Sequence, residues 1–183
     1  MMAAMKLHSG FTLIELLVTL TVASIFFAVA IPAFNSFVQN DRDTGQANSL
    51  VGSLSYARSE AVKRASPNGI TVCPSANGAA CDLGPWTEGW IVIYIDPVTP
   101  ANTIVLQAIP ALSTANTVTP VAGPATGITF NSNGTVPAAP FTLRICDPRG
   151  AAFARQVEVN LTGRVAASQK PGFSVAGAAL ACP

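Results

Sequence analysis

The apolar residues of this chain are concentrated in one long run near its N-terminus. Residues 11–34 contain a single ionisable side chain, that of Glu15. A helix rises about 1.5 Å per residue, so the run is long enough to cross a hydrocarbon core of about 30 Å. The pattern predicts a membrane-spanning helix. It also predicts a partner for Glu15, because an isolated charge inside a membrane is costly.

Helical spacing continues beyond Pro32. Apolar residues recur three and four positions apart, with polar residues between them. The pattern predicts a helix that extends to about Ala65 with an amphipathic second half, and the segment SPNG at 66–69 ends it. We expect a kink at Pro32, and glycines form two further weak points. The apolar positions are Leu50, Leu54, Ala57 and Ala61, and the glycines are Gly45 and Gly52.

After residue 69 the pattern changes to short alternating or β-branched runs separated by Pro, Gly, Asn and Ser, which predicts an all-β head. Trp86, Trp90 and Phe130 are expected to fill its interior, as large aromatic residues in strand regions usually do. Residues 97–124 are rich in Ala, Thr and Pro, and most of this section is expected to be a variable loop region. The expected strands cover residues 70–73, 90–95, 103–109, 127–130, 141–146 and 156–161.

The composition agrees with one domain plus an apolar appendage. The chain has 183 residues, of which 50% are hydrophobic and only 10% charged, whereas about a quarter are charged in an ordinary soluble domain. The formal net charge of +1 gives no overall attraction to nucleic acid or anionic lipid. Any electrostatic function must therefore come from a local patch.

All four cysteines lie outside the apolar run, and their even number favours two disulfides in an oxidising compartment. Three connectivities are possible. We favour the two pairings that close a short loop around Gly78 and tether the C-terminal tail. Reduced thiols in a cytosolic protein are the alternative. The favoured pairs are Cys73 with Cys81 and Cys146 with Cys182.

The sequence offers little for catalysis. Its one histidine, His8, precedes the apolar run, which removes histidine-activated nucleophiles and histidine-bound metals from the rest of the chain. The head carboxylates show no paired spacing, and no GxxxxGK phosphate loop is present. We therefore predict a protein that is not an enzyme and has no cofactor or metal site.

The charges that flank the apolar run indicate its orientation. Lys6 and His8 precede it and Asp41, Arg42 and Asp43 follow it, so the N-terminus is expected on the cytoplasmic side. Two other interpretations remain. A signal peptide cut near Ala30 would remove the run, and an ordinary single-pass anchor could tolerate one glutamate.

The segment GFTLIE at 10–15, followed by the apolar helix, resembles the class III signal of type IV pilins and type II secretion pseudopilins. The resemblance implies that a prepilin peptidase cuts between Gly10 and Phe11 and methylates the new N-terminal Phe11. If Met5 is the start, the leader is the shorter MKLHSG. The freed amino group of Phe11 is a cation near neutral pH, and Glu15 of a neighbouring subunit could neutralise it inside a filament.

The rest of the chain resembles the GspH/FimT family of minor pilins and pseudopilins. The resemblance is carried by residues 47–64, WTEGW and IVIYID at 86–96, ITFNSNGTV at 128–136 and VEVNLTGRV at 157–165. It implies an α+β type IV pilin fold, with a long N-terminal helix on an antiparallel sheet or sandwich and a family domain over about 47–170. Glu60 and Arg64 in this helix form an i, i+4 pair, expected on a solvated face.

The resemblance implies four segments and a place in the cell. The segments are a leader at 1–10, a transmembrane and assembly half of the helix at 11–34, an amphipathic half at 35–66 and a β-rich periplasmic head at 67–183. The protein is expected to be a single-pass inner-membrane protein that joins a filament, with prepilin peptidase and other pilins or pseudopilins as partners. The favoured function is a minor pilin of a type IV pilus, and the alternative is the H-type pseudopilin of a type II secretion system.

A third possible function is DNA uptake. Between residues 144 and 170 five cations face two anions. Some FimT-like minor pilins bind DNA through a Gly-Arg-x-Arg motif, which Gly163 and Arg164 resemble, although Ala166 replaces the second arginine. Because phosphate affinity grows with the number of cations, this replacement weakens the expectation. The candidate contacts with double-stranded DNA are Arg155, Arg164 and Lys170.

Overall fold

The computed structural model describes residues 11–99, 102–112, 115–137 and 140–182. Residues up to Asn40 and residues from Asp41 onward form two compact units. One helix, α1 (Leu13–Arg64), runs through the end of the first unit into the second. Its α-helical hydrogen bonding continues past Pro32, Gly45 and Gly52, so the expected long helix is present. The kink at Pro32 stays a prediction.

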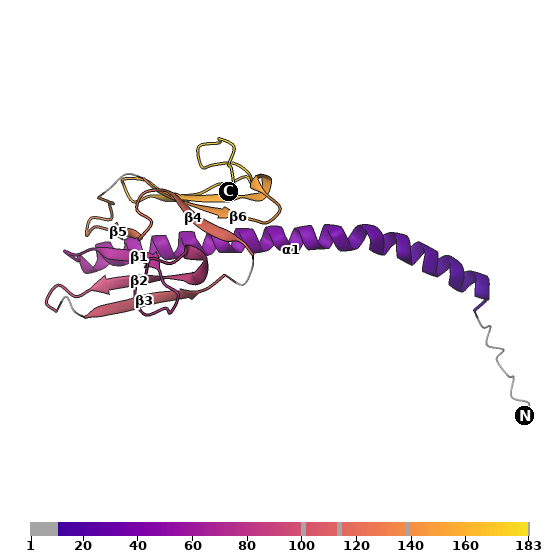
Figure 1. Ribbon diagram of the computed structural model, residues 1–183, viewed down its shortest axis with the longest axis horizontal. Helices are drawn as coiled ribbons and strands as arrows, with labels where there is room; N and C mark the ends of the chain where they lie inside the picture. Colours follow the sequence, from indigo (N-terminus) through magenta and orange to yellow (C-terminus); the bar gives the residue numbers. More distant parts are fainter. Residues whose placement is uncertain (1–10, 100–101, 113–114, 138–139, 183) are drawn as a thin grey trace, which may run out of the picture. The chain divides into compact units, whose positions relative to one another are not determined.

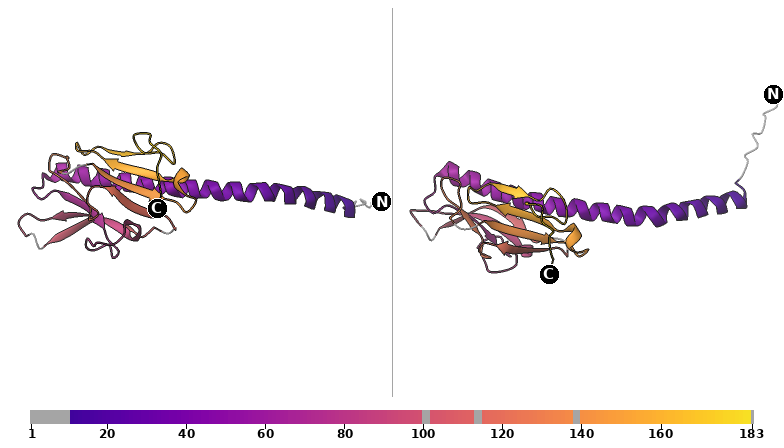
Figure 2. Two further views of the ribbon diagram at one scale, coloured as in Figure 1. Left: turned by 45° about the horizontal axis from the view of Figure 1, so that its top comes forward. Right: turned by 90° about the horizontal axis from the view of Figure 1, so that it is seen from above.

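The head contains two four-stranded sheets in which every strand pair is antiparallel. In Figures 1 and 2 the sheets lie against the second half of α1. The first sheet has the order β3-β2-β1-β5 and the second β4-β6-β7-β8. A long helix on antiparallel sheets confirms the expected α+β type IV pilin fold. The strands are β1 (Ile70–Pro74), β2 (Gly89–Ile95), β3 (Thr103–Pro110), β4 (Thr117–Ala122), β5 (Ile128–Phe130), β6 (Phe141–Cys146), β7 (Arg155–Val159) and β8 (Val165–Ala167).

The hydrophobic core is formed by one face of α1 and the inner faces of both sheets. The predicted helix positions Leu50, Leu54, Ala57 and Ala61 are fully buried, and so are the three aromatic residues that the sequence placed in the interior, Trp86, Trp90 and Phe130. The indole N–H of Trp90 donates to Ser53 Oγ on the helix at 3.0 Å, so this buried donor is satisfied. These residues therefore pack rather than form a ligand cage.

Two strands were not predicted. Strand β4 lies inside the section 97–124 that was expected to be mainly loop, and it pairs with β6 in spite of Pro120, beside which the register shifts. Strand β8 has three residues and pairs with β7. Two short 3-10 helices, η1 (Trp86–Glu88) and η2 (Ala151–Phe153), complete the head.

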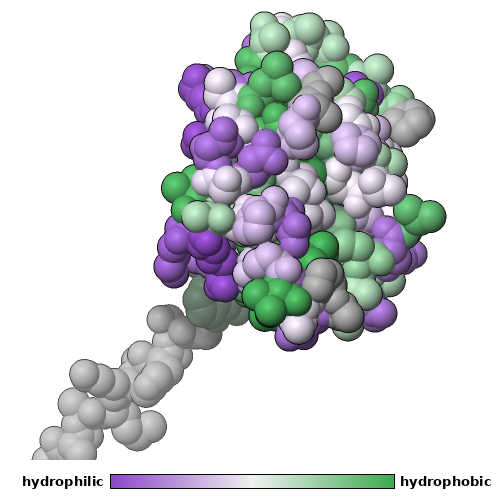
Figure 3. Space-filling view, turned by 90° about the vertical axis from the view of Figure 1, so that its left-hand side faces the viewer, coloured by the Kyte–Doolittle hydropathy of each residue, from purple (hydrophilic) through white to green (hydrophobic). Residues whose placement is uncertain are grey.

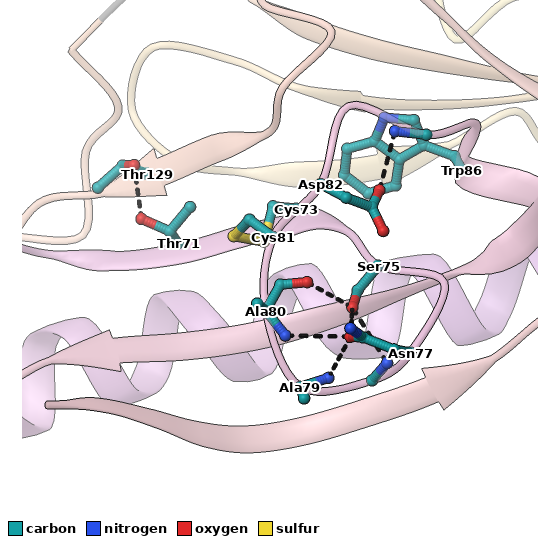
Figure 4. Close-up of a disulfide and its surroundings, with 12 residues drawn as sticks. Thr71, Cys73, Ser75, Asn77, Ala79, Ala80, Cys81, Asp82, Trp86 and Thr129 are labelled. Atoms are coloured by element: carbon teal, nitrogen blue, oxygen red, sulfur yellow. Dashed lines mark hydrogen bonds between the residues drawn. A yellow bond between two sulfur atoms is a disulfide. The ribbon is translucent and has the colours of Figure 1, made fainter.

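Both disulfides have the connectivity that the sequence favoured. Cys73 joins Cys81 across a loop that follows β1, and the loop is ordered by Ser75 Oγ, which donates to the carbonyl of Ala80 at 2.6 Å, and by Asn77 Oδ1 (Figure 4). Cys146 at the end of β6 joins Cys182. The tail is also held by Arg144, which donates to the carbonyl of Ala181 at 2.6 Å. It packs through Leu180 against Cys146 and Ala154.

Candidate assembly and binding surfaces

The first half of α1 exposes its apolar side chains around the helix. Leu13 is 77% exposed, and Phe26 and Val29 are each about 70% exposed; Phe11, just before the helix, is 86% exposed. Among the described residues, α1 is the one helix long and apolar enough to cross a membrane. In contrast, hydrophilic and hydrophobic residues are interspersed on the face of the head in Figure 3. The first half of α1 is therefore a surface made for lipid or for other apolar helices.

Glu15 lies in the first turn of this exposed surface. Thr12 caps the helix, because its Oγ1 accepts a hydrogen bond from the Glu15 N–H at 3.3 Å. The order Thr-x-x-Glu is that of a capping box, of which the described residues form only the half that Thr12 supplies. The Glu15 carboxylate is exposed and has no partner among residues 11–99, 102–112, 115–137 and 140–182. Gly10, on the other side of the expected cleavage site, lies outside the described residues.

A buried ion network lies where α1 enters the head. Arg149 donates to Asp43 Oδ2 at 2.9 Å and to Asp147 Oδ2 at 2.7 Å, and Asn116 donates to Asp43 Oδ1 at 2.6 Å. Burial raises the pKa of the Asp43 carboxyl, while the hydrogen bonds from Arg149 lower the pKa of Asp147. The guanidinium also lies 4.0 Å from the centre of the Phe153 ring. Sequence reasoning missed this network, since it joins residues about a hundred positions apart.

The prediction that Glu60 and Arg64 form a solvated pair was wrong for Glu60, whereas Arg64 is exposed. Glu60 is 7% exposed. Its carboxylate accepts a hydrogen bond from Arg64 Nε at 2.6 Å, which lowers the pKa of Glu60. The guanidinium of Arg64 lies 5.2 Å from the centre of the Tyr94 ring on β2. The pair therefore fastens the end of α1 to the first sheet, a contact that the i, i+4 spacing could not show.

The five cations of the predicted patch divide into different environments. Arg144 and Arg149 are engaged by the tail and by the buried carboxylates. Arg164 and Lys170 line one surface depression of about 420 Å³, whereas Arg155 is not among its lining residues. Arg164 also lines a second depression of about 520 Å³ beside the helix, together with Lys63 and Arg58.

Arg58 is held in place between two turns of the head. Its Nε donates to the carbonyl of Gly134, and its Nη2 donates to the carbonyl of Thr162, each at 3.1 Å. Of the cations beside Arg164, Arg58 is therefore fixed by structural hydrogen bonds, and Lys63 contacts Glu60 at 3.4 Å.

Within the described ranges no group of three or more His, Cys, Asp or Glu side chains could hold a metal ion.

The exposed apolar helix, whose carboxylate has no partner in the described part of the chain, and the two-sheet head on the same helix define a pilin-like assembly subunit. Comparison with known families supports this class. The chain belongs to the family of the type II transport protein GspH, which matches residues 46–163, and the prokaryotic N-terminal methylation motif matches residues 5–31. It is a GspH/FimT-like pilin, and proteins of this family are structural subunits rather than enzymes.

Solved structures show the same fold. Two crystal structures of the type IV minor pilin FimU from Pseudomonas aeruginosa (strain PAO1) are similar to this chain. The structure in space group P21 is 24% identical, covers 73% of this chain and 98% of its own, and has a TM-score of 0.55. The structure in space group P65 is 23% identical, covers 68% and 91%, and has a TM-score of 0.53. No curated protein matches the chain.

Proposed function

We propose that this chain is a minor pilin of a type IV pilus. A prepilin peptidase removes residues 1–10 and methylates Phe11, and residues 11–34 then hold the protein in the inner membrane. The amphipathic half of the helix, 35–66, carries a β-rich head, 67–183, on the periplasmic side. The subunit enters a filament near its tip and helps to start assembly. The observation that supports this function best is the exposed apolar half of α1, whose one carboxylate, Glu15, has no partner in the part of the chain that the structure describes.

The carboxylate has a partner once the leader is removed. The new amino group of Phe11 is cationic near neutral pH, and a neighbouring subunit can present it to Glu15 in a dry filament core. Each charge is costly there alone, and the pair removes much of that cost. Because the pair forms at one axial offset between helices, it also selects the register of the filament.

The capping interaction of Thr12 allows the ion pair to be tested against a local role. If Glu15 acts between subunits, Glu15→Gln should leave a cleaved, membrane-held protein that is excluded from filaments. Thr12→Ala removes the capping oxygen, keeps the carboxylate and should still assemble. The measurements are mass spectrometry of the native N-terminus and immunodetection of the subunit in sheared filaments. Normal incorporation of Glu15→Gln, or equal defects in both variants, would contradict the ion pair.

The alternative is the H-type pseudopilin of a type II secretion system, which the description of the matched family favours. The pilus is favoured by the disulfide-tethered tail and by the fold shared with a type IV minor pilin. A clean deletion scored in parallel for surface pili and for exoprotein release separates the two. Loss of pili with normal release supports the pilus, and the reverse result supports the secretion system.

DNA binding is a second candidate function, favoured by the position of Arg164 between two depressions that also contain Lys63 and Lys170. Phosphate contacts by these cations would be independent of sequence and sensitive to salt. The head lacking residues 1–36 should retard double-stranded DNA at low salt, and Arg164→Ala should weaken the shift more than Arg155→Ala. The absence of any shift at low micromolar protein would remove this function.

A further inference from the structure

The two sheets of the head have four edge strands, and β3 is the longest of them. β5 and β8 have three residues each, and β4 contains Pro120 and a register shift. β3 also contains a register shift, opposite Val92 and Ile93, but it has eight residues and its proline stands at the end of the strand. Proteins usually protect sheet edges with short strands, prolines, bulges or charges, because open backbone groups invite another strand. β3 therefore differs from the other edges in its length and in the position of its proline.

The sequence of β3 also lacks the usual protection by charge. Residues 103–110 read TIVLQAIP and contain no Lys, Arg, Asp or Glu. Among the described residues its backbone hydrogen bonds go to β2 alone. Ile104 is 40% exposed at the start of the strand. The outer edge of β3 thus offers backbone donors and acceptors along an uncharged strand, as β-strand addition requires.

This edge ends at a surface depression of about 400 Å³ between α1 and the end of β3. On the helix side it is lined by Arg42, Gly45 and Ser49, and on the sheet side by Ile109, Pro110 and Leu112. A Cβ atom added at Gly45 would meet nothing within 4 Å. The depression therefore has room for side chains from another molecule.

The charge of Arg42 indicates which chemical group of another molecule would bind in the depression. Arg42 is exposed, and no partner for its guanidinium is found among the described residues. A carboxylate is the group that would pair with it. The strand β3 of a second copy does not supply one itself, because residues 103–110 contain no acidic side chain.

We infer that β3 and this depression together form a docking site for an extended segment of a different pilin subunit, which adds to the edge of β3 and places a carboxylate beside Arg42. The inference rests on the proposed function, since it requires neighbouring subunits in a filament. Through this docking site, neighbouring subunits of the filament contact one another by their heads as well as by their helices. A contact of this kind is selective, because it needs both an uncharged strand and an acidic group at one end.

The experiment uses the full chain in its own cells, with a photo-crosslinking amino acid at Ile104. The expected product joins this chain to the head of another pilin subunit, and mass spectrometry of the crosslinked peptide should find an extended segment with a nearby Asp or Glu. Arg42→Glu, which repels that carboxylate, should lower the yield about tenfold. Gly45→Leu fills the depression and should also lower it.

Gly52→Leu is the matched control. It is the same change on the same helix, its added Cβ also meets nothing within 4 Å, and Gly52 does not line the depression. Its crosslink yield should equal that of the unsubstituted helix. A crosslink to another helix or to a second copy of this chain, or equal yields in Gly45→Leu and Gly52→Leu, would overturn the docking site.

Two measurements on the same cells separate this inference from the proposed function. If Phe11 is the methylated N-terminus and the chain is in filaments, but the crosslink is absent or insensitive to Gly45→Leu, the docking site is wrong and the function stands. If the native chain keeps residues 1–10, or never enters a filament, the proposed function itself is wrong.

Discussion

Arg149 Nη2 donates a hydrogen bond to Asp43 Oδ2 at 2.9 Å, which joins the turn after β6 to the helix 106 positions earlier in the chain. The same guanidinium binds Asp147 through both of its carboxylate oxygens. One cation thus compensates two buried carboxylates, with Asn116 adding a further donor to Asp43. The orientation of α1 in the head depends on this contact as well as on apolar packing.

Removal of the Arg149 guanidinium should therefore be strongly destabilising. Arg149→Met leaves Asp43 and Asp147 buried without their cation, and breaking a buried ion pair in this way costs about 3–5 kcal/mol. Urea unfolding of the head beginning at residue 37 measures the loss. The control is Arg164→Met, because that side chain is exposed and a surface substitution usually changes stability by no more than about 0.5 kcal/mol. Equal midpoints for the two variants would show that the network does not hold the helix.

Glu60 should make the stability of the head depend on pH. Its pKa is lowered below the ordinary 4.5, first of all by the hydrogen bond from Arg64. The unfolded chain therefore binds a proton at a higher pH than the folded one, so the stabilisation is present above about pH 4.5 and is lost as the pH falls through the folded pKa. In a plot of the free energy of unfolding against pH, the acid limb is the fall in stability below about pH 4.5. Glu60→Gln should make this fall smaller.

Arg64→Met and Lys63→Met test the cause of that pH dependence. Arg64 donates at 2.6 Å, while Lys63 contacts the same carboxylate at 3.4 Å and is much more exposed. Arg64→Met should therefore flatten the acid limb more than Lys63→Met, in urea unfolding series between pH 2.5 and 6 (about two units either side of the ordinary carboxyl pKa). A larger effect of Lys63→Met would contradict the assignment to Arg64.

A comparison of Gly163 with Gly177 separates two costs of replacing glycine by alanine: the strain of a positive φ and the steric clash of the added Cβ. Both have positive φ, 73° and 88°. A Cβ at Gly163 would overlap the carbonyl oxygen of Gly134, whereas one at Gly177 meets nothing within 4 Å. Gly177→Ala should cost about 1 kcal/mol from φ alone, and Gly163→Ala several times more because two turns must separate. Thermal unfolding of both variants provides the comparison.

The two disulfides should contribute unequally to stability. Cys146–Cys182 closes a separation of 36 residues and Cys73–Cys81 one of 8. The chain-entropy relation gives about 4 kcal/mol for the longer loop and about 2.5 kcal/mol for the shorter one. Replacing both cysteines of each pair with serine should lower the urea midpoint more for the Cys146 pair. That variant should also become susceptible to limited proteolysis at residues 172–182.

The sequence predicted the parts of this fold that have strong local patterns. The apolar run, the periodic positions Leu50 and Leu54, and the strand at 141–146 are readable because their neighbours repeat the same signal. β4 was missed because Pro120 and the surrounding Ala and Thr resemble a loop, and its strand character comes from pairing with β6. β8 was missed because its three residues, VAA, include one β-branched residue and no aromatic one, whereas the equally short β5, ITF, was predicted.

The buried charges could not be predicted, for a different reason. Asp43 stands beside Asn40, Asp41 and Arg42, a neighbourhood that indicates a solvated helix. Only the fold shows that Asp43 faces Arg149. Arg155, Arg164 and Lys170 illustrate the opposite error, since closeness in sequence suggested one patch, and the depression that contains Arg164 and Lys170 does not include Arg155.

The buried face of α1 extends from Asp43 to Ala61 and supplies part of the head's own interior. A protease that cuts before Asp43 would release a soluble fragment with an intact interior. A cut a few residues later would remove the Asp43 carboxylate and part of the buried face of α1. The boundary at which the head can be separated from the exposed apolar half of α1, for example for crystallisation, is therefore set by the first buried aspartate and not by the last exposed phenylalanine.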